Sequence, residues 1–169
     1  MAPPPQRLLL TLLVVGLWAC GGSGSYEGGS YTDSEARYAI GEPGAGWERV
    51  DVAGDNDLAF THDALAAVIQ VNATCDPGMD VPLAALRNHL LIGWTEREVQ
   101  SEDLIDLDDR EALQTHLVAK IDGVPRELVL TVMKKDGCVY DFAVVAPPGS
   151  GMGQARPSYD AVVSGFRVN

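Results

Sequence analysis

The sequence predicts an α+β domain in which an antiparallel β-sheet is flanked by helices. Three observations support this fold class. Short runs rich in Val, Ile and Tyr are separated by Gly, Pro, Asn and Asp, as strands and turns are. Two Asp-Gly pairs divide three of these runs and predict tight hairpins. Two further segments space their apolar residues three and four positions apart, as amphipathic helices do. Strands interspersed with helices in this order are typical of an α+β sandwich.

The chain begins with a segment that has the layout of a secretory signal peptide. Its first seven residues carry one charged side chain, Arg7, and the run LLLTLLVVGLW follows without any charge. This run is shorter than the roughly 20 apolar residues that a bilayer span needs. A basic start, a short apolar centre and small residues at its end are typical of a cleaved leader.

The last four residues of this segment, Leu17 to Cys20, read LWAC and resemble the bacterial lipobox. The resemblance implies that residues 1–19 are removed as a lipoprotein signal peptide and that Cys20 carries diacylglycerol. Several acyl chains would make a stable membrane anchor. Gly21 lacks the acidic character that retains enteric lipoproteins at the inner membrane, which favours the outer membrane, facing the periplasm or the cell surface. The alternative is an ordinary signal peptide cut after Ala19, which leaves Cys20 as a free thiol.

The remaining 150 residues are enough for one domain with a real core. They hold 11 basic and 24 acidic side chains, because Arg7 is the only charge in the leader. Such an acidic surface repels nucleic-acid phosphates and anionic lipid headgroups. We therefore expect no nucleic acid as a partner and no electrostatic docking to the membrane, so the lipid on Cys20 has to provide the anchoring.

The first part of this domain is expected to contain a tether, several short strands and one helix. Residues 20–34, rich in Gly and Ser, are expected to form a flexible tether, and residues 35–169 a single globular domain. Short strands are expected within residues 37–62, and Ala66–Cys75 is a longer strand candidate. Asp80 is a plausible N-cap for a helix with Pro82 in its first turn. Four apolar residues then share one face of that helix: Leu83, Leu86, Leu90 and Trp94.

The second part predicts a meander and a closing helix. The acidic segment Ser101–Asp109 is expected to be a loop or the edge of a sheet. Three strands follow, joined at Asp122-Gly123 and Asp136-Gly137, and they should pair antiparallel. Residues 147–154, PPGSGMGQ, are expected to form a loop. A helix with Pro157 in its first turn then places four apolar residues on one face: Tyr159, Val162, Val163 and Phe166.

Two cysteines remain after Cys20. Outside the cytoplasmic membrane the compartment is oxidising, so Cys75 and Cys138 are expected to form a disulfide that closes a loop of about 60 residues. Such a closure is worth about 4 kcal/mol from chain entropy. Two separate buried thiols are the alternative. The chain lacks a C-x-x-C motif, and its Cys and His residues lack the ligand spacing of a zinc site.

No set of residues has the pattern of a catalytic centre. His62 precedes Asp63, but a base of this kind needs a nucleophile, and no G-x-S-x-G motif is present. His62 is therefore expected at the surface, His89 on the first helix and His116 on a strand, away from the main core face. The densest carboxylate clusters lack the glycine and glutamate spacing of calcium loops. The carboxylate clusters lie at Asp106, Asp108 and Asp109 and at Asp55–Asp57. We expect no metal site, no cofactor and no catalytic residue.

The domain resembles the PsbP superfamily in its broad bacterial sense, over residues 35–169. The residues that carry the resemblance are GEPGAGW, the amphipathic helix, the Asp-Gly hairpins, the strand CVYDFAVV and the ending SGFRV. The resemblance implies a non-catalytic accessory or binding module. The leading expectation is an accessory, assembly or protein-interaction module that contacts another envelope protein. The alternatives are a periplasmic module that holds a small apolar or cationic ligand between sheet and helix, and a hydrolase in which His62 or His116 lies beside Ser, Asp or Glu in a deep cleft.

Overall fold

The computed structural model describes residues 24–51 and 56–169, which form two antiparallel β-sheets and two α-helices. The predicted α+β class is confirmed. The expected leader, residues 1–19, and the expected lipid site Cys20 lie outside the described residues. Within the described part of the chain, neither helix is long and apolar enough to cross a bilayer.

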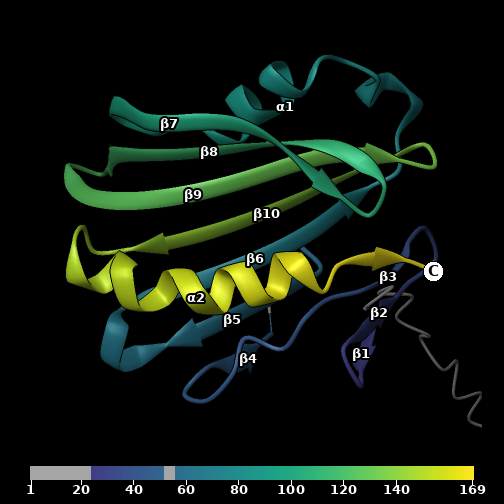
Figure 1. Ribbon diagram of the computed structural model, residues 1–169, viewed down its shortest axis with the longest axis horizontal. Coiled ribbons are helices and arrows are strands. Elements are labelled where there is room, and N and C mark those ends of the chain that lie inside the picture. Colours follow the sequence, from purple (N-terminus) through teal and green to yellow (C-terminus); the bar gives the residue numbers. More distant parts are fainter. Residues whose placement is uncertain (1–23, 52–55) are drawn as a thin grey trace, which may run out of the picture.

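The larger sheet has seven strands in the order β4-β5-β6-β10-β9-β8-β7, and every neighbouring pair is antiparallel (Figure 1). The two edges differ greatly in length, since β4 has three residues and β7 has thirteen. The strands are β4 (Glu48–Val50), β5 (Leu58–His62), β6 (Ala67–Thr74), β7 (Thr95–Leu107), β8 (Arg110–Ile121), β9 (Val124–Lys135) and β10 (Cys138–Ala146).

The meander of β8, β9 and β10 is as predicted. Asp122-Gly123 and Asp136-Gly137 each place both turn residues at positive φ, with values of 50° and 77° in the first turn and 52° and 82° in the second. Two consecutive residues at positive φ match the right-handed twist of the strands they join, and Asp-Gly adopts this geometry at little cost. Ile121 therefore pairs with Val124 at the end of the first hairpin.

The second sheet corrects the expected tether. Its strands, in the order β1-β2-β3-β11, are β1 (Ser25–Glu27), β2 (Ser30–Thr32), β3 (Arg37–Ala39) and β11 (Arg167–Val168). Residues 25–32 thus form a hairpin of the domain instead of a flexible linker. Tyr31 drives this, because its ring is buried and lies 5.1 Å from the ring of Tyr38 on β3. Gly28 and Gly29 supply the positive φ of the turn.

Both helices differ at their ends from the expected bounds. α1 (Leu83–Leu90) is shorter than expected and begins after Pro82, and Asp80 pairs with Lys134 instead of capping it. α2 (Ser150–Ser164) begins inside the glycine-rich segment expected to be a loop. The reason is burial, since its first turns place Met152 and Ala155 in the core. Pro157 consequently lies inside the helix instead of in its first turn.

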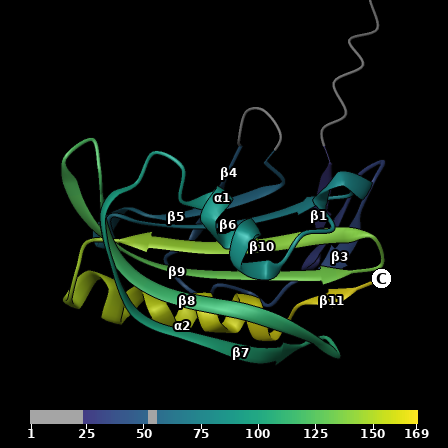
Figure 2. The ribbon, with the colours of Figure 1, turned by 90° about the horizontal axis from the view of Figure 1, so that it is seen from above.

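The helices cover opposite faces of the large sheet (Figure 2). Successive residues of a strand point to opposite faces. On β10, Tyr140 and Phe142 therefore pack beneath α2 and against Phe166, whereas Val139 packs against Leu86 of α1. The α2 side holds the main core. The α1 side is only partly covered, because an eight-residue helix spans a small part of seven strands.

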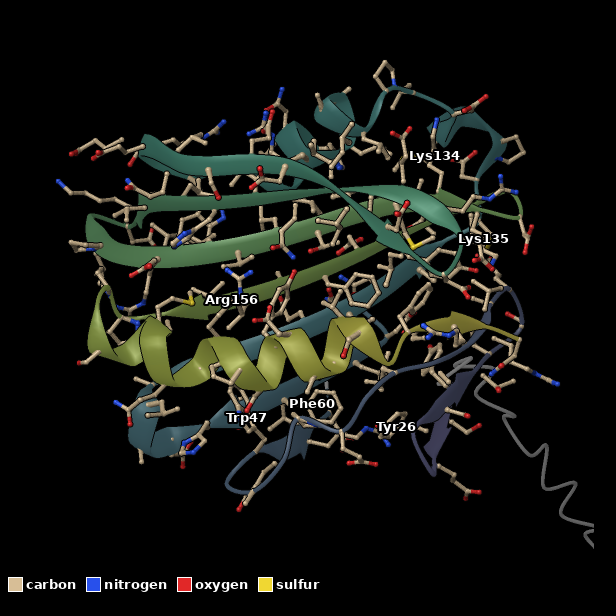
Figure 3. All side chains as sticks on the ribbon, viewed as in Figure 1. Tyr26, Trp47, Phe60, Lys134, Lys135 and Arg156 are labelled. Carbon is tan, nitrogen blue, oxygen red and sulfur yellow. A yellow bond between two sulfur atoms is a disulfide. The ribbon has the colours of Figure 1, made fainter. Side chains whose placement is uncertain are left out.

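Aromatic side chains fill the α2 side as core residues. Trp47 and Phe60 lie on one side of α2, and Arg156 extends from the helix on the other side, toward β9 (Figure 3). Its guanidinium Nη2 donates to Gln114 Oε1 at 2.7 Å. Trp94, after α1, packs at the edge of a small cluster on the opposite face.

Candidate functional site

A chain of hydrogen-bonded polar residues lies on the α1 side of the sheet, where the neighbouring positions are apolar. Asn72 of β6 and Asp141 of β10 are directly opposite each other in the ladder, so their side chains share one face. The Asn72 Nδ2 donates to Asp141 Oδ1 at 2.9 Å. The Asn72 Oδ1 in turn accepts from the backbone N–H of Asp57 at 3.2 Å. Both ends of the amide are therefore held, and its orientation is fixed.

Asp57 connects this chain to the second sheet. Its Oδ2 accepts hydrogen bonds from the Tyr38 hydroxyl at 2.9 Å and from the backbone N–H of Ala73 at 2.9 Å. Burial raises the pKa of Asp57 above its ordinary value, and these hydrogen bonds counteract the rise. The sequence pattern predicts Asp57 only as a turn residue. Its role could not be read from the local pattern because its partners come from two other strands, β3 and β6.

Asp141 is the carboxyl group of this hydrogen-bonded network whose pKa is raised most strongly. Burial raises its pKa to about 6, and repulsion from Asp57 adds to the rise. The hydrogen bond from Asn72 and the nearby His89 act in the opposite sense. Buried carboxylates are costly unless they are paired. Asp141 is paired in this way through its Oδ1, which accepts from Asn72 at 2.9 Å.

A cleft of about 260 Å³ lies between α1 and the sheet at this point, and we call it the α1 cleft. One wall is apolar and comes from α1, from the segment before it and from β9 and β10. The polar wall lies beside Val132, on the same face of the sheet, and includes Asp141 and Asn72. Its lining residues are Asn56, Asn72, Thr74, Met79, Leu86, His89, Leu90, Val132, Val139 and Asp141. An apolar body with a few convergent polar groups is the usual make-up of a small-molecule site.

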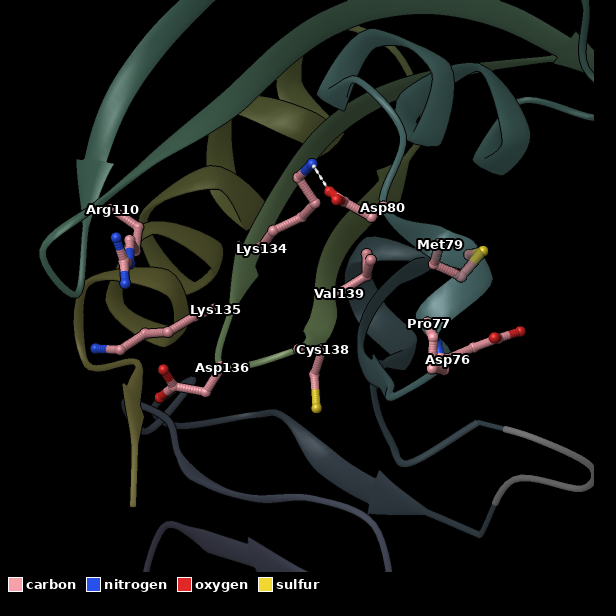
Figure 4. Close-up of a pocket in the computed structure, with 11 residues that line it drawn as sticks. Asp76, Pro77, Met79, Asp80, Arg110, Lys134, Lys135, Asp136, Cys138 and Val139 are labelled. Carbon is pink, nitrogen blue, oxygen red and sulfur yellow. Dashed lines mark hydrogen bonds and ion pairs between the residues drawn. The ribbon is translucent and has the colours of Figure 1, made fainter.

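A second cleft, of about 350 Å³, lies at the end of the sheet near Cys138 and contains three basic residues. Its cations do not converge. Lys134 Nζ pairs with Asp80 at 2.8 Å, whereas Lys135 extends away on the other side of β9 (Figure 4). Lys135 Nζ contacts Asp108 Oδ2 at 2.7 Å. Lys134 and Lys135 therefore form ion pairs within the fold and do not point together into the cleft.

The disulfide between Cys75 and Cys138 is present in the structure. It joins the residue after β6 to the first residue of β10, next to the pair Thr74 and Val139 in the ladder. The bond therefore closes one end of the central strand pair. A redox role was not expected, and the position between paired strands fits a structural cross-link.

The three histidines lie in separate environments. His62 ends β5 and packs edge-on against Trp47, with ring centroids 5.5 Å apart, so it is less exposed than expected. His116 Nε2 lies 2.7 Å from Glu127 Oε1, on the α2 side of the sheet, and neither residue lines the two clefts described above. His89 alone lines the α1 cleft.

The acidic clusters have structural partners. Asp108 accepts from Lys135 and from the backbone N–H of Val168, and so ties the β7–β8 turn to the C-terminal strand. These contacts hold its pKa below the ordinary value against the effect of burial. Across residues 24–51 and 56–169, no group of three or more His, Cys, Asp or Glu side chains is arranged to hold a metal ion.

The edge strand β7 is the most exposed large element of the domain. All of its first ten residues are exposed, and five of its thirteen side chains are acidic. The exposed large hydrophobic residues of the described chain gather at this edge of the sheet. They lie on β7, on the connection before it and at the β8–β9 turn: Ile92, Val99, Leu104, Ile121 and Val124. We call β7 together with these residues the β7 edge.

Comparison with known proteins identifies the fold. No protein-family model and no curated protein matches the chain. Among solved structures, cyanobacterial PsbP (CyanoP) from Synechocystis sp. PCC 6803 superimposes with a TM-score of 0.56 at 18% identity, over 95% of this chain and 99% of its own. LpqN, involved in cell envelope biogenesis of Mycobacterium tuberculosis, gives a TM-score of 0.57 at 10% identity, over 90% and 87%. The domain therefore has a PsbP-like α+β fold.

Proposed function

We propose that this protein is a lipid-anchored, non-enzymatic accessory protein of the bacterial cell envelope that binds another envelope protein along its β7 edge. The leader and the LWAC motif at Leu17–Cys20 support the anchor. The disulfide is consistent with an oxidising compartment. The fold is shared with LpqN, a protein of cell envelope biogenesis, which agrees with this location. On this proposal the outer membrane carries the anchor.

The observation that carries the proposal is the exposed apolar surface of the β7 edge. Leu104 is 62% exposed and Ile92 70% exposed, and neither has a covering element. An edge strand also presents unpaired backbone N–H and C=O groups, which are a template for another strand. With thirteen residues at about 3.3 Å each, β7 offers roughly 43 Å of such a template.

The charges of β7 favour a basic partner. Glu96 pairs with Lys120 and Glu102 with Arg87 within the domain. In the described structure the other three carboxylates of the strand, at Glu98, Asp103 and Asp106, have no ion-pair partner. Like charges facing each other across two strands are unfavourable, so β7 resists pairing with a second copy of itself. A partner strand with Lys or Arg would complement it.

Co-purification after crosslinking tests this proposal. Full-length protein is isolated from its own membranes in mild detergent, beside Leu104→Lys on β7 and the matched control Gln154→Lys on α2. We expect the wild type and Gln154→Lys to recover one partner in near-stoichiometric amount. Leu104→Lys should recover about tenfold less, because it places a charge in the apolar contact. Recovery of the protein alone, or equal recovery by Leu104→Lys, contradicts the proposal.

The anchor is tested separately with Cys20→Ser. Labelling of cells with a radioactive fatty acid should mark the wild type, and the label should be lost in Cys20→Ser, which should also leave the membrane fraction. A wild type that takes up no label would show that Cys20 is not a lipid site. The β7 edge could then still be assessed with the soluble protein.

A further inference from the structure

The α1 cleft contains a charged group that the protein-interaction proposal does not use. The Asp141 carboxylate lies on its polar wall, and its Oδ1 is held by Asn72 at 2.9 Å. The amide of Asn72 is itself fixed by the N–H of Asp57 at 3.2 Å. The acceptor is therefore oriented before any ligand arrives, which lowers the entropy cost of binding.

The electrostatics of this wall select a cation. Asp57 and Asp141 repel each other, and both are disfavoured as charged groups by burial. His89 from α1 lowers the pKa of Asp141, and the charge of Asp141 in turn raises the pKa values of Tyr38 on β3 and Tyr159 on α2. Among the described residues, no Lys or Arg lines the cleft. An incoming cation would supply the opposite charge that the carboxylates lack.

The rest of the cleft selects an apolar body of limited size. Leu86 and Leu90 from α1 face Val132 and Val139 from the sheet, with Met79 at the end nearest the 3₁₀ turn Pro77–Met79. Methionine adapts to ligands of different shape. A volume of about 260 Å³ equals that of roughly nine liquid waters, so the cleft has room for a small organic molecule.

We propose that the α1 cleft is a binding site for a small aliphatic ammonium compound, with its ammonium group against Asp141 and its chain between α1 and the sheet. An ammonium ion donates three hydrogen bonds and is about twice as strongly held by a carboxylate as a neutral donor is. The site lies apart from the β7 edge, and it is tested on the purified protein without any partner. Failure of one proposal is therefore distinguishable from failure of the other.

The probes are n-pentylammonium, 1-pentanol and pentanoate, which share a chain and differ in charge. Isothermal titration measures their binding to full-length protein in a non-ionic detergent. At about pH 7.5, pentylammonium should bind at least about tenfold more tightly than 1-pentanol. Pentanoate should bind more weakly than either, because it meets the charge of Asp141. Partition of a probe into the micelles cancels when variants are compared.

The matched variants are Asp141→Asn in the cleft and Asp160→Asn, which removes an exposed carboxylate from α2 on the other sheet face. Asp141→Asn should reduce the preference for pentylammonium over 1-pentanol to about twofold or less, and Asp160→Asn should leave it unchanged. Leu90→Phe, which fills the apolar end, should weaken both probes. The preference of the wild type should also decrease at about pH 5, where Asp141 binds a proton.

Carboxyl NMR gives a readout that a purely structural role would not affect. Saturation with pentylammonium should lower the pKa of Asp141 from about 6, because the bound cation favours the charged form. The proposal is overturned if 1-pentanol binds as tightly as pentylammonium, if Asp141→Asn keeps the preference, or if pentylammonium does not bind at millimolar concentration.

Discussion

The buried carboxylate of Asp141 should destabilise the ligand-free protein at neutral pH, and Asp141→Asn should remove that cost. Burial raises its pKa from 3.8 to about 6. Between these values the folded protein holds a proton that the unfolded chain has lost, so stability decreases as the pH rises through this window. Above about pH 6 the full cost is present. A shift of about two units corresponds to about 3 kcal/mol.

Urea unfolding of the wild type and Asp141→Asn at about pH 4 and about pH 8 measures this cost. The amide oxygen of Asn can still accept from Asn72, so the local hydrogen bond is retained. We expect Asp141→Asn to gain up to about 3 kcal/mol over the wild type at pH 8 relative to their difference at pH 4. Asp33 and Asp108 have lowered pKa values, so their contribution to stability increases as the pH rises. Both proteins contain these residues, so this contribution cancels in the comparison. A difference between the two proteins that is independent of pH would show that the buried carboxylate of Asp141 carries no such cost.

Three further substitutions test the fold. Replacing Cys75 and Cys138 by Ser together should cost about 4 kcal/mol in chemical unfolding without reductant, since the bond closes a loop with a sequence separation of 63 residues; an unchanged midpoint would contradict this. Tyr159→Phe should cost about 1 kcal/mol, because the buried hydroxyl donates to Thr131 Oγ1 at 2.7 Å, and a neutral result in urea would show that this bond is unimportant. Gly153→Ala should raise the stability by up to about 1 kcal/mol in thermal unfolding, because it lies inside α2 with no neighbouring atom within 4 Å of a Cβ, and a loss would indicate crowding.

The sequence was sufficient to predict the two hairpins whose turns depend on only two adjacent residues. The Asp-Gly pairs at 122–123 and 136–137 fixed two hairpins because few other dipeptides adopt both positive φ values. Burial of distant partners decided the parts that were wrong. The glycine-rich residues 25–32 became a hairpin because Tyr31 packs on Tyr38, and residues 150–154 became helical because Met152 enters the core.

The α1 cleft could not have been located from the sequence. Asn72 and Asp141 are 69 residues apart and meet only because β6 and β10 pair in one register. Each residue alone is a polar residue in an apolar strand, which usually marks a solvent-facing position. That pattern was visible in AVIQVNAT and CVYDFAVVA, and it is the one signal that could have suggested the pair. The exposed β7 edge was partly foreseen, since the acidic segment was expected to be a loop or a sheet edge.

Photocrosslinking in intact cells tests whether the β7 edge docks on another envelope protein. A photoreactive phenylalanine derivative is placed at Leu104 on β7, or at Gln154 on α2 as the control, in otherwise wild-type full-length protein. We expect one discrete adduct with an envelope protein from position 104 and none from position 154. No adduct from position 104, or the same adduct from both positions, would contradict the claim that this domain docks through its β7 edge.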